Sequence, residues 1–391
     1  MKLKVLIAPD KFKGTLASQK VAEAIAAGWH KIRPGDRLEL LPMCDGGDGF
    51  GEVMAGLTGA QRRSAVTVNA QQARCLTPWW LEAETNTAIV EAAQTIGLAM
   101  LAPARPHPFG LDTRGLGLLL AQVAGRGVRH CLVGLGGSAT NDGGFGMARA
   151  LGWEFLDRRR NPIQSWTDLN SLVWLRPPQR AIWFEQIIIA VDVKNPLLGP
   201  RGATRIFGPQ KGLSKSDLPI AERALRRLAR VARETLGEDF AEQPGAGSAG
   251  GLGFAGMAFL GAKPETGFEI FAQYAQLQRR LKSADLVLTG EGQMDASTHM
   301  GKGVGSLAQL CLEKGIPCLG FAGTVNQEAQ KKLRLFKRVF ALTDLTSLDQ
   351  AKSQPAKWLE LLASEAAKWR TVSADHRCSL TSTRQTDKCH Q

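Results

Sequence analysis

Glycine-rich turns that carry acidic residues recur along this chain and are the segments best suited to chemistry. They occupy residues 44–49, 134–144, 244–251 and 290–295, and a Gly-Lys-Gly sequence follows at 301–303. Glycine has no Cβ, so the backbone amides of such turns can approach a phosphate closely. Carboxylates beside the turns can hold the divalent cation that a polyphosphate needs. The pattern predicts an enzyme that handles a nucleotide phosphate.

Four lysines stand beside these turns or in similar short segments. Lys11 and Lys13 follow the first apolar stretch, Lys211 precedes a glycine, and Lys302 lies between two glycines. An ammonium group next to turn amides supplies the positive charge that binds a phosphate or a carboxylate. We therefore expect these lysines to take part in anion binding.

Three aspartates are the leading candidates for catalysis or metal binding. Asp10 lies just past the first apolar stretch, Asp45 begins an Asp-Gly-Gly turn, and Asp192 ends a wholly apolar stretch. A carboxylate at the end of a buried strand needs a partner or a metal. Asp10 and Asp45 also fit an alternative in which each stabilises only its own turn. The number of such sites, rather than any single one, favours function.

The composition fits a globular protein of two domains. The chain has 391 residues, of which 44% are hydrophobic and 22% charged, and this length provides ample material for a buried core. The seven cysteines include no Cys-x-x-Cys pair, which predicts reduced thiols rather than disulfides. The six histidines do not cluster in the sequence, so zinc is not expected.

The net charge of +13 raises the question of nucleic acid, but no recognition motif or aromatic interleaving is present. Much of the basic charge falls on residues 217–236 and 331–338, which predicts solvated helix faces and a general attraction for anionic substrates. No apolar run reaches about 20 residues, and the first apolar stretch is too short for a secretory signal. We expect a cytoplasmic protein, a monomer or a homodimer, with no nucleic-acid partner and no membrane span.

Apolar runs and helical periodicity alternate along most of the chain. All the acidic, glycine-rich turns except 244–251 follow the carboxyl end of a predicted strand, which is where ligands of open α/β sheets bind. Residues 63–92 alternate in the manner of antiparallel strands. Strands are predicted at 4–8, 37–42, 130–135, 187–193, 284–289, 316–322 and 338–342, and helices at 18–29, 115–124, 145–151, 217–236 and 268–281.

These elements predict an α/β protein of two domains with the active site in the cleft between them. A Rossmann-like parallel-sheet domain is built from both chain ends, residues 1–62 plus 284–372. An inserted α/β domain covers residues 63–283. The polar segment 373–391 has no periodicity and is expected to be a disordered tail.

A formal GxGxxG sequence at Gly245, Gly247 and Gly250 raises the alternative of a dehydrogenase. A dinucleotide fingerprint must lie between a strand and a helix, and no strand is predicted before Gly245. The helix expected after residue 251 still offers its N-terminal amides to an anion. The sequence contains no Walker A motif and no protein-kinase catalytic loop.

Seven ordered segments together resemble the type 1 glycerate kinase family, bacterial enzymes that phosphorylate D-glycerate with ATP. The resemblance extends from about residue 4 to residue 369. The matching segments are 8–14, 45–47, 136–144, 192–197, 207–212, 245–247 and 289–292, the last followed by Asp295, Thr298, Gly301 and Lys302.

The resemblance implies ATP, Mg²⁺ and a small hydroxy-acid substrate, with 2-phosphoglycerate and ADP as products. We assign Asp45 to accept the proton of the glycerate hydroxyl, Lys11 to catalysis with it, and Asp192, Glu291 and Asp295 to Mg²⁺. A kinase that forms 3-phosphoglycerate and a non-catalytic binding protein on the same fold remain alternatives. The residues expected to bind substrate or phosphate are Asp10, Lys13, Gly136, Gly137, Ser138, Asn141, Asp142, Lys211, Gly245, Gly247 and Lys302.

Overall fold

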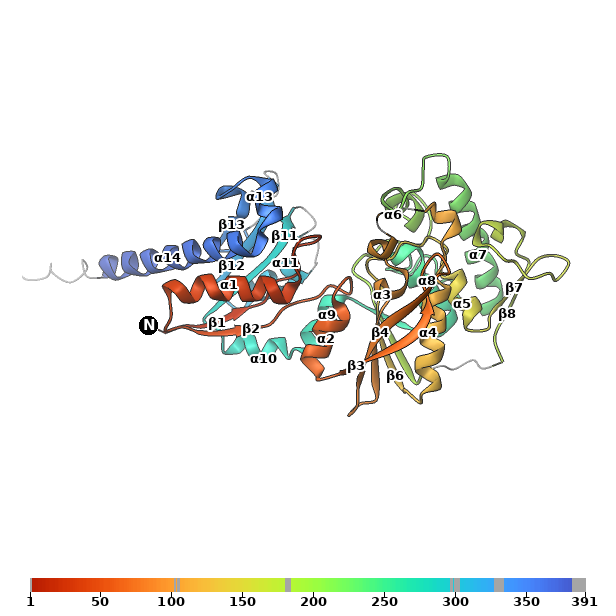
Figure 1. Cartoon of the computed structure of the whole chain (residues 1–391), viewed down its shortest axis with the longest axis horizontal. Coiled ribbons are helices and arrows are strands. Elements are labelled where there is room, and N and C mark those ends of the chain that lie inside the picture. Colours follow the sequence, from red (N-terminus) through yellow and green to blue (C-terminus); the bar gives the residue numbers. More distant parts are fainter. Residues whose placement is uncertain are drawn as a thin grey trace, which may run out of the picture. The chain divides into compact units, whose positions relative to one another are not determined.

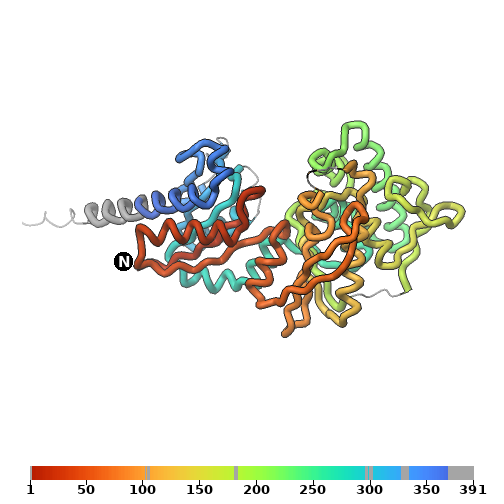
Figure 2. Tube along the Cα trace, viewed as in Figure 1, coloured from red at the N-terminus to blue at the C-terminus, as the bar shows by residue number. Residues whose placement is uncertain are grey.

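Residues from both ends of the chain fold together. In the computed structural model, Met1–Met43 and Ala275–Gln391 form one unit, the terminal unit, and Cys44–Tyr274 form a second, the middle unit. Figure 2 shows the red N-terminal trace and the blue C-terminal trace within the same unit. The structure describes residues 2–101, 103, 106–179, 184–295, 298, 303–326 and 334–381, with side chains up to residue 368.

Five described strands of the terminal unit form a parallel sheet in the order β13-β12-β11-β1-β2. Val5 of β1 pairs with Leu286 of β11 on one side and with Leu38 of β2 on the other. The central strands are nearly continuous apolar runs, as in parallel sheets that are covered on both faces. The strands are β1 (Lys4–Ile7), β2 (Arg37–Leu40), β11 (Leu286–Met294), β12 (Cys318–Val325) and β13 (Arg338–Ala341).

Helices α1 and α14 lie side by side over one face of this sheet (Figure 1). Val21, Ile25 and Trp29 of α1 are fully buried, and their four-residue spacing places them on one stripe of the helix. Helix α11 packs against β11 and β12. The helices of this unit are α1 (Ser18–Ile32), α10 (Leu277–Lys282), α11 (Gly303–Glu313), η6 (Leu342–Asp344), α13 (Leu348–Ser353) and α14 (Pro355–Thr381).

The strand order of the terminal unit creates a topological switch point between β1 and β11. The chain leaves β1 toward β2 and later returns on the opposite side of β1, and open α/β sheets bind ligands at the carboxyl ends of such a strand pair. The backbone N–H of Asp10 donates to the carbonyl of Gly290 at 2.8 Å. Asp10 and Glu291, the residue after Gly290, therefore lie at this switch point.

Six strands of the middle unit form a mixed sheet in the order β10-β9-β6-β5-β4-β3. Strands β5, β6, β9 and β10 are parallel, so their carboxyl ends share one edge, and β3 and β4 continue the sheet antiparallel. Strands β7 and β8 form a separate antiparallel pair. The strands are β3 (Gln61–Val68), β4 (Arg74–Glu82), β5 (Thr87–Glu91), β6 (His130–Gly134), β7 (Glu154–Leu156), β8 (Trp174–Arg176), β9 (Gln186–Ala190) and β10 (Lys263–Glu265).

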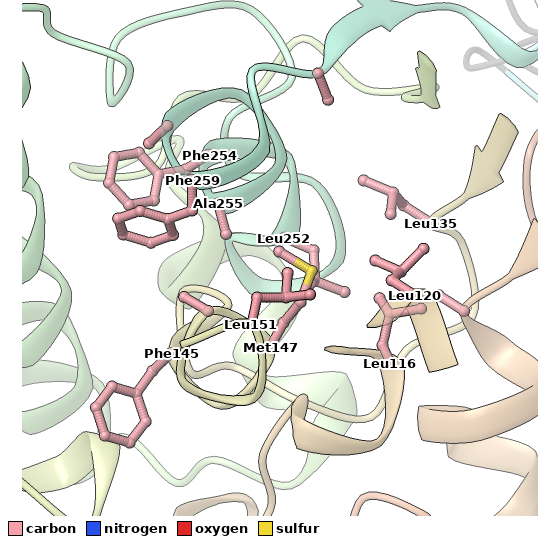
Figure 3. Packing of buried hydrophobic residues seen from close by; sticks show 14 of the residues in the cluster. Leu116, Leu120, Leu135, Phe145, Met147, Leu151, Leu252, Phe254, Ala255 and Phe259 are labelled. Carbon is pink, nitrogen blue, oxygen red and sulfur yellow. The ribbon is translucent and has the colours of Figure 1, made fainter. Parts of the chain in front are cut away.

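The core of the middle unit lies where α5 packs between α4 and α8. Figure 3 shows Met147 of α5 and Leu151, the residue after α5, near Leu116 of α4 and Leu252 of α8. The helices of this unit are α2 (Phe50–Thr58), α3 (Ala93–Ile96), η1 (Leu98–Leu101), η2 (Pro108–Gly110), α4 (Arg114–Gly125), α5 (Phe145–Ala150), η3 (Trp166–Ser171), α6 (Ala203–Lys211), α7 (Leu218–Leu236), η4 (Ser248–Gly250), α8 (Leu252–Leu260) and α9 (Gly267–Tyr274).

The predicted α/β architecture with parallel sheets is confirmed. The units divide at Met43 and Tyr274, whereas the sequence analysis divides the chain after residues 62 and 283. The first boundary differs because α2 packs against β4, β5 and α9 of the middle unit.

The single helix predicted over residues 268–281 is wrong. The structure has two helices there, α9 and α10, and Gln276 between them has a left-handed backbone with φ of 48°. Helix α14 continues to Thr381, into the segment 373–391 that the sequence analysis predicts to be a disordered tail. Residues 382–391 lie outside the described part of the chain.

Candidate active site

The Asp-Gly-Gly turn at residues 45–47 lies across the carboxyl edge of the parallel strands in the middle unit. The backbone N–H of Gly136, after β6, donates to the carbonyl of Gly46 at 3.0 Å. A Cβ built on Gly46 would lie 2.7 Å from the Cβ of Ala190 at the end of β9. One on Gly136 would lie 2.5 Å from the Cα of Gly47. These glycines are required because two backbone turns pack directly on each other.

Asp45 and Asp192 lie close together at this edge. The Oδ1 of Asp192 accepts a hydrogen bond from the N–H of Gly267 at 3.0 Å, and a Cβ on Gly267 would lie 2.4 Å from the carbonyl carbon of Asp45. The Oδ1 of Asp45 accepts from the N–H of Gly47 at 3.1 Å. The sequence analysis placed Asp45 in the other domain, across a cleft from Asp192. That placement is wrong because the turn docks on the middle sheet.

Glu91 supports the turn from the end of β5 and was missed by the sequence analysis. It is 1% exposed, and its carboxylate accepts hydrogen bonds from the N–H groups of Gly49 at 3.1 Å and Gly51 at 3.0 Å. Burial raises the pKa of Glu91, and the nearby charge of Asp48 adds to the rise. Like Asp192, Glu91 ends an apolar strand, and this was the signal in the sequence that could have identified it.

Lys211 is buried beneath the loop that follows β6. Its Nζ donates to the Oγ of Ser138 at 3.1 Å and to the carbonyl of Thr140 at 2.6 Å. Burial lowers the pKa of Lys211 from 10.5 to about 7, although the charge of Asp142 opposes this shift. The structure thus brings two predicted site residues, Lys211 and Ser138, into direct contact.

Asp142 organises the same loop from within. Its carboxylate accepts hydrogen bonds from the N–H and the hydroxyl of Thr113 and from the N–H groups of Gly144 and Gly146, at 2.7–3.2 Å. Burial raises the pKa of Asp142 to about 6, and the charge of Asp112 contributes. Because both oxygens are engaged within the fold, the geometry favours a structural role for Asp142 over the predicted phosphate contact.

Three polar side-chain atoms near Lys211 are buried and, within the described part of the chain, make no hydrogen bond: Thr140 Oγ1, Asn141 Oδ1 and Ser248 Oγ. The amide nitrogen of Asn141 donates to the Oγ1 of Thr204 on α6 at 3.0 Å. Buried polar atoms are normally satisfied by protein, water or ligand. These atoms can therefore form hydrogen bonds to a bound group, and one of them belongs to Asn141, which the sequence predicts to bind substrate or phosphate.

The turn at residues 244–251 packs on neighbouring loops. A Cβ on Gly247 would lie 2.2 Å from the carbonyl oxygen of Pro196, and one on Gly250 would lie 2.0 Å from that of Thr140. Gly245 has φ of 89° and lies against Val191. Residues 237–251, all of them described, contain no strand. The GxGxxG sequence is therefore not a dinucleotide fingerprint, because its glycines are needed for loop packing and no strand precedes them.

A second group of predicted residues lies at the switch point of the terminal unit. The Oδ1 of Asp10 accepts from the N–H of Lys11 at 2.7 Å, and the Lys11 ammonium lies 3.9 Å from the same oxygen. Lys13 is exposed, and its backbone nitrogen would lie 3.2 Å from a Cβ on Gly292. Asp10, Lys11 and Lys13 thus follow the end of β1 and lie beside residues 290–292, which belong to β11 in the structure rather than to a turn after a strand ending at 289. Lys302 lies outside the described residues.

Glu291 and Asp295 are linked through Thr298. The Thr298 hydroxyl donates to Oε1 of Glu291 at 2.7 Å and accepts from the N–H of Asp295 at 3.1 Å. Among the described residues, no group of three or more His, Cys, Asp or Glu side chains could hold a metal. Mg²⁺ usually keeps its waters and takes only one or two protein carboxylates besides the substrate phosphates. The donor set therefore fits Mg²⁺ bound together with a nucleotide.

The comparisons with known proteins extend over nearly the whole chain. The glycerate kinase family matches residues 5–371. The chain belongs to the glycerate kinase family. It is therefore a kinase, as the sequence resemblance predicted. In the part of the chain that is described, no helix has the length and apolar character needed to cross a membrane.

Individual relatives cover similar lengths. The chain is 37% identical over 339 residues to the glycerate 2-kinase of Escherichia coli (strain K12), which covers 83% of this chain and 86% of the relative. It is 33% identical over 368 residues to a glycerate kinase of Halalkalibacterium halodurans, which covers 93% of this chain and 97% of the relative. A crystal structure assigned as glycerate kinase 2 from Salmonella typhimurium LT2 superimposes with a TM-score of 0.79 at 32% identity, covering 96% of this chain and 100% of that one.

Proposed function

We propose that this kinase transfers the γ-phosphoryl group of ATP to D-glycerate and produces 2-phosphoglycerate and ADP. The observation that carries the proposal is the pair Asp45 and Asp192, held together at the carboxyl edge of the parallel strands by Gly46 and Gly267. Membership of the glycerate kinase family and the similarity to a glycerate 2-kinase support the substrate and the position of transfer.

Asp45 is the proposed acceptor of the glycerate hydroxyl proton. A carboxylate held in a fixed orientation by its own turn can orient the hydroxyl and take its proton as the phosphorus–oxygen bond forms. The N–H of Gly47 holds the Asp45 carboxylate within the turn, and the carbonyl of Gly46 accepts from the N–H of Gly136 in the neighbouring loop. Asp168 on η3 is exposed and has the same charge, but it does not belong to an Asp-Gly-Gly turn. It therefore provides a matched control.

Phosphate binding is proposed for the two glycine turns and for Lys11 and Lys13. Gly136, Gly137 and Ser138 belong to the loop after β6, whose backbone amides and hydroxyl can donate to a phosphate. Gly245 and Gly247 precede α8, whose N-terminal amides favour anions. In the terminal unit, Lys11 and Lys13 would bind a phosphate or the glycerate carboxylate, next to Asp10.

Asp192 in the middle unit, and Glu291 and Asp295 in the terminal unit, are each proposed as a Mg²⁺ ligand, with one or two carboxylates used beside the nucleotide phosphates. When bound, the cation neutralises charge on the phosphates. The residues themselves orient the site: Asp192 is fixed by the N–H of Gly267, and Glu291 by the hydroxyl of Thr298. Lys302, next in sequence to this group, is proposed to bind phosphate as well.

The test is to incubate the purified protein with ATP, Mg²⁺ and D-glycerate and to follow ADP release. Phosphorus NMR of the product then separates 2-phosphoglycerate from 3-phosphoglycerate, the alternative product. Asp45→Asn should remove most of the turnover, because an amide is a poor proton acceptor, and Asp168→Asn should leave it unchanged. If glycerate binds but no ADP is released above background, the non-catalytic alternative holds and the proposed reaction is wrong.

A further inference from the structure

The contact between Lys211 and Ser138 points to a role that neither residue type alone suggests. Lys211 is 6% exposed and Ser138 is 6% exposed, so neither side chain is an ordinary surface group. The Nζ of Lys211 lies 3.1 Å from Ser138 Oγ and 2.6 Å from the carbonyl oxygen of Thr140. Both bonds hold the loop that leaves β6 at the carboxyl edge of the sheet.

The direction of this hydrogen bond determines where the serine proton can go. A protonated lysine has three donors and no acceptor, whereas a serine hydroxyl can donate one bond and accept others. Ser138 Oγ must therefore accept from the charged Lys211, and its own hydrogen remains for another acceptor. Within the described part of the chain, Ser138 Oγ makes no other hydrogen bond.

An anionic oxygen is the acceptor that suits this hydroxyl best. The ammonium behind Ser138 polarises the O–H bond, and hydrogen bonds to an ionised acceptor are roughly twice as strong as neutral ones. Ser138 follows Gly136 and Gly137, whose turn packs against the Asp-Gly-Gly turn. The hydroxyl is thus placed next to the proposed reaction site.

We propose that Lys211 is a positioning residue that directs the Ser138 hydroxyl as a donor to an anionic group of the substrate, either the glycerate carboxylate or a nucleotide phosphate. This role rests on the proposed function, because it takes its two ligands from that reaction. Lys211 itself does not touch the ligand in this arrangement.

The charge of Lys211 changes within an accessible pH range. Burial lowers the pKa of Lys211 to about 7, so the neutral amine predominates at higher pH and can accept a hydrogen bond from the Ser138 hydroxyl, which then no longer points its hydrogen at the ligand. Asp142 is the charge that acts on Lys211. Helix α7, packed against α6, carries Glu222, which accepts from Gly199. His107 pairs with Asp217, and η4 carries no titratable side chain.

The experiment measures binding of D-glycerate and of ADP with Mg²⁺ by calorimetry at pH 6.5 and 8.5. The proteins are the wild type, Lys211→Met and Ser138→Ala. We expect one of the two anions to bind the wild type about tenfold more weakly at pH 8.5. Lys211→Met should bind that anion weakly at both pH values, and Ser138→Ala should lose most of the pH dependence. Comparison with Lys211→Met cancels the titration of ADP itself.

The anion whose affinity follows pH identifies the group that Ser138 contacts. Equal pH dependence in the wild type and Lys211→Met, or none in the wild type for either anion, would overturn the proposal. If Lys211→Met does not fold, the proposal is still tested by comparing the pH dependence of anion binding in the wild type with that in Ser138→Ala. If the wild type binds with the expected pH dependence but releases no ADP from ATP, the proposed reaction fails and the positioning role stands. Turnover without that pH dependence would support the reaction and overturn the positioning role.

Discussion

Substitution of Gly136 by alanine should separate the two turns that build the proposed site. The added Cβ would lie 2.5 Å from the Cα and 3.1 Å from the nitrogen of Gly47. Carbon atoms pack at about 3.5–4.0 Å, so the turns must move apart by roughly 1 Å. The φ of Gly136 is not among the positive values, so the backbone itself tolerates alanine. The effect therefore comes from this contact alone.

Two consequences follow from the displacement, and they are measured separately. Overpacking of this kind costs about 1–3 kcal/mol of folding free energy, which urea unfolding can detect. A displacement of about 1 Å in a catalytic group lowers turnover about 100-fold, and Asp45 lies one residue before the displaced glycines. We therefore expect Gly136→Ala to reduce kcat/KM for ADP release far more than its loss of stability explains.

Gly56 on α2 provides the matched control, because a Cβ there meets nothing within 4 Å. Alanine should stabilise that helix by about 1 kcal/mol and leave turnover unchanged. The reasoning is refuted if Gly136→Ala has wild-type stability and activity. If Gly136→Ala is less stable but fully active, the packing argument stands and the turn does not position a catalytic group.

Three further substitutions test the buried charges and the metal assignment. Burial lowers the pKa of Lys211 from 10.5 to about 7, so the unfolded chain binds this proton more tightly, and the contribution of Lys211 to wild-type stability falls as pH falls from about 10 to 7. Lys211→Met should escape this loss, and its stability relative to the wild type should be about 2 kcal/mol greater at pH 7 than at pH 9 in urea unfolding. Asp142→Asn should destabilise by about 2 kcal/mol, because its amide would face N–H donors. Since the pKa of Asp142 is raised from 3.8 to about 6, the contribution of this carboxyl to stability is fully present below pH 3.8 and is lost as pH rises to about 6, so the deficit of Asp142→Asn should shrink over that range. Asp192→Asn can still accept from Gly267 but is a poorer Mg²⁺ ligand, so it should fold normally, as circular dichroism would show, and lose most turnover at limiting Mg²⁺; unchanged turnover there would contradict the assignment.

Much of the secondary structure follows directly from the sequence. The apolar runs that became β1, β6 and β9 are followed by glycine or acidic residues, so the type of each element could be predicted. The ends of β1 and β6 lie within one residue of the prediction, whereas β9 ends at Ala190, three residues before its predicted end. The long helix α7 follows from an apolar stripe between charged residues. Asp45, Ser138 and Asp192 could be named as candidate site residues because each occurs in a turn after a predicted strand.

The unit boundaries could not be read in the same way. Nothing in residues 275 and 276, Ala and Gln, signals a helix break, yet Gln276 has a left-handed backbone between α9 and α10. The assignment of α2 to the middle unit depends on its packing against β4 and β5. Such choices are made by contacts between residues far apart in the chain, which local patterns do not contain.

The sequence by itself determined which residue types this protein has for chemistry: carboxylates and lysines beside glycine turns, in an order shared with the glycerate kinase family. Only the tertiary structure decided what each one does. Burial turned Asp142 and Glu91 into supports for backbone loops and placed Lys211 behind Ser138. The physical reason is that desolvation and hydrogen-bond partners set the charge and orientation of a side chain, and both depend on distant segments that folding brings together.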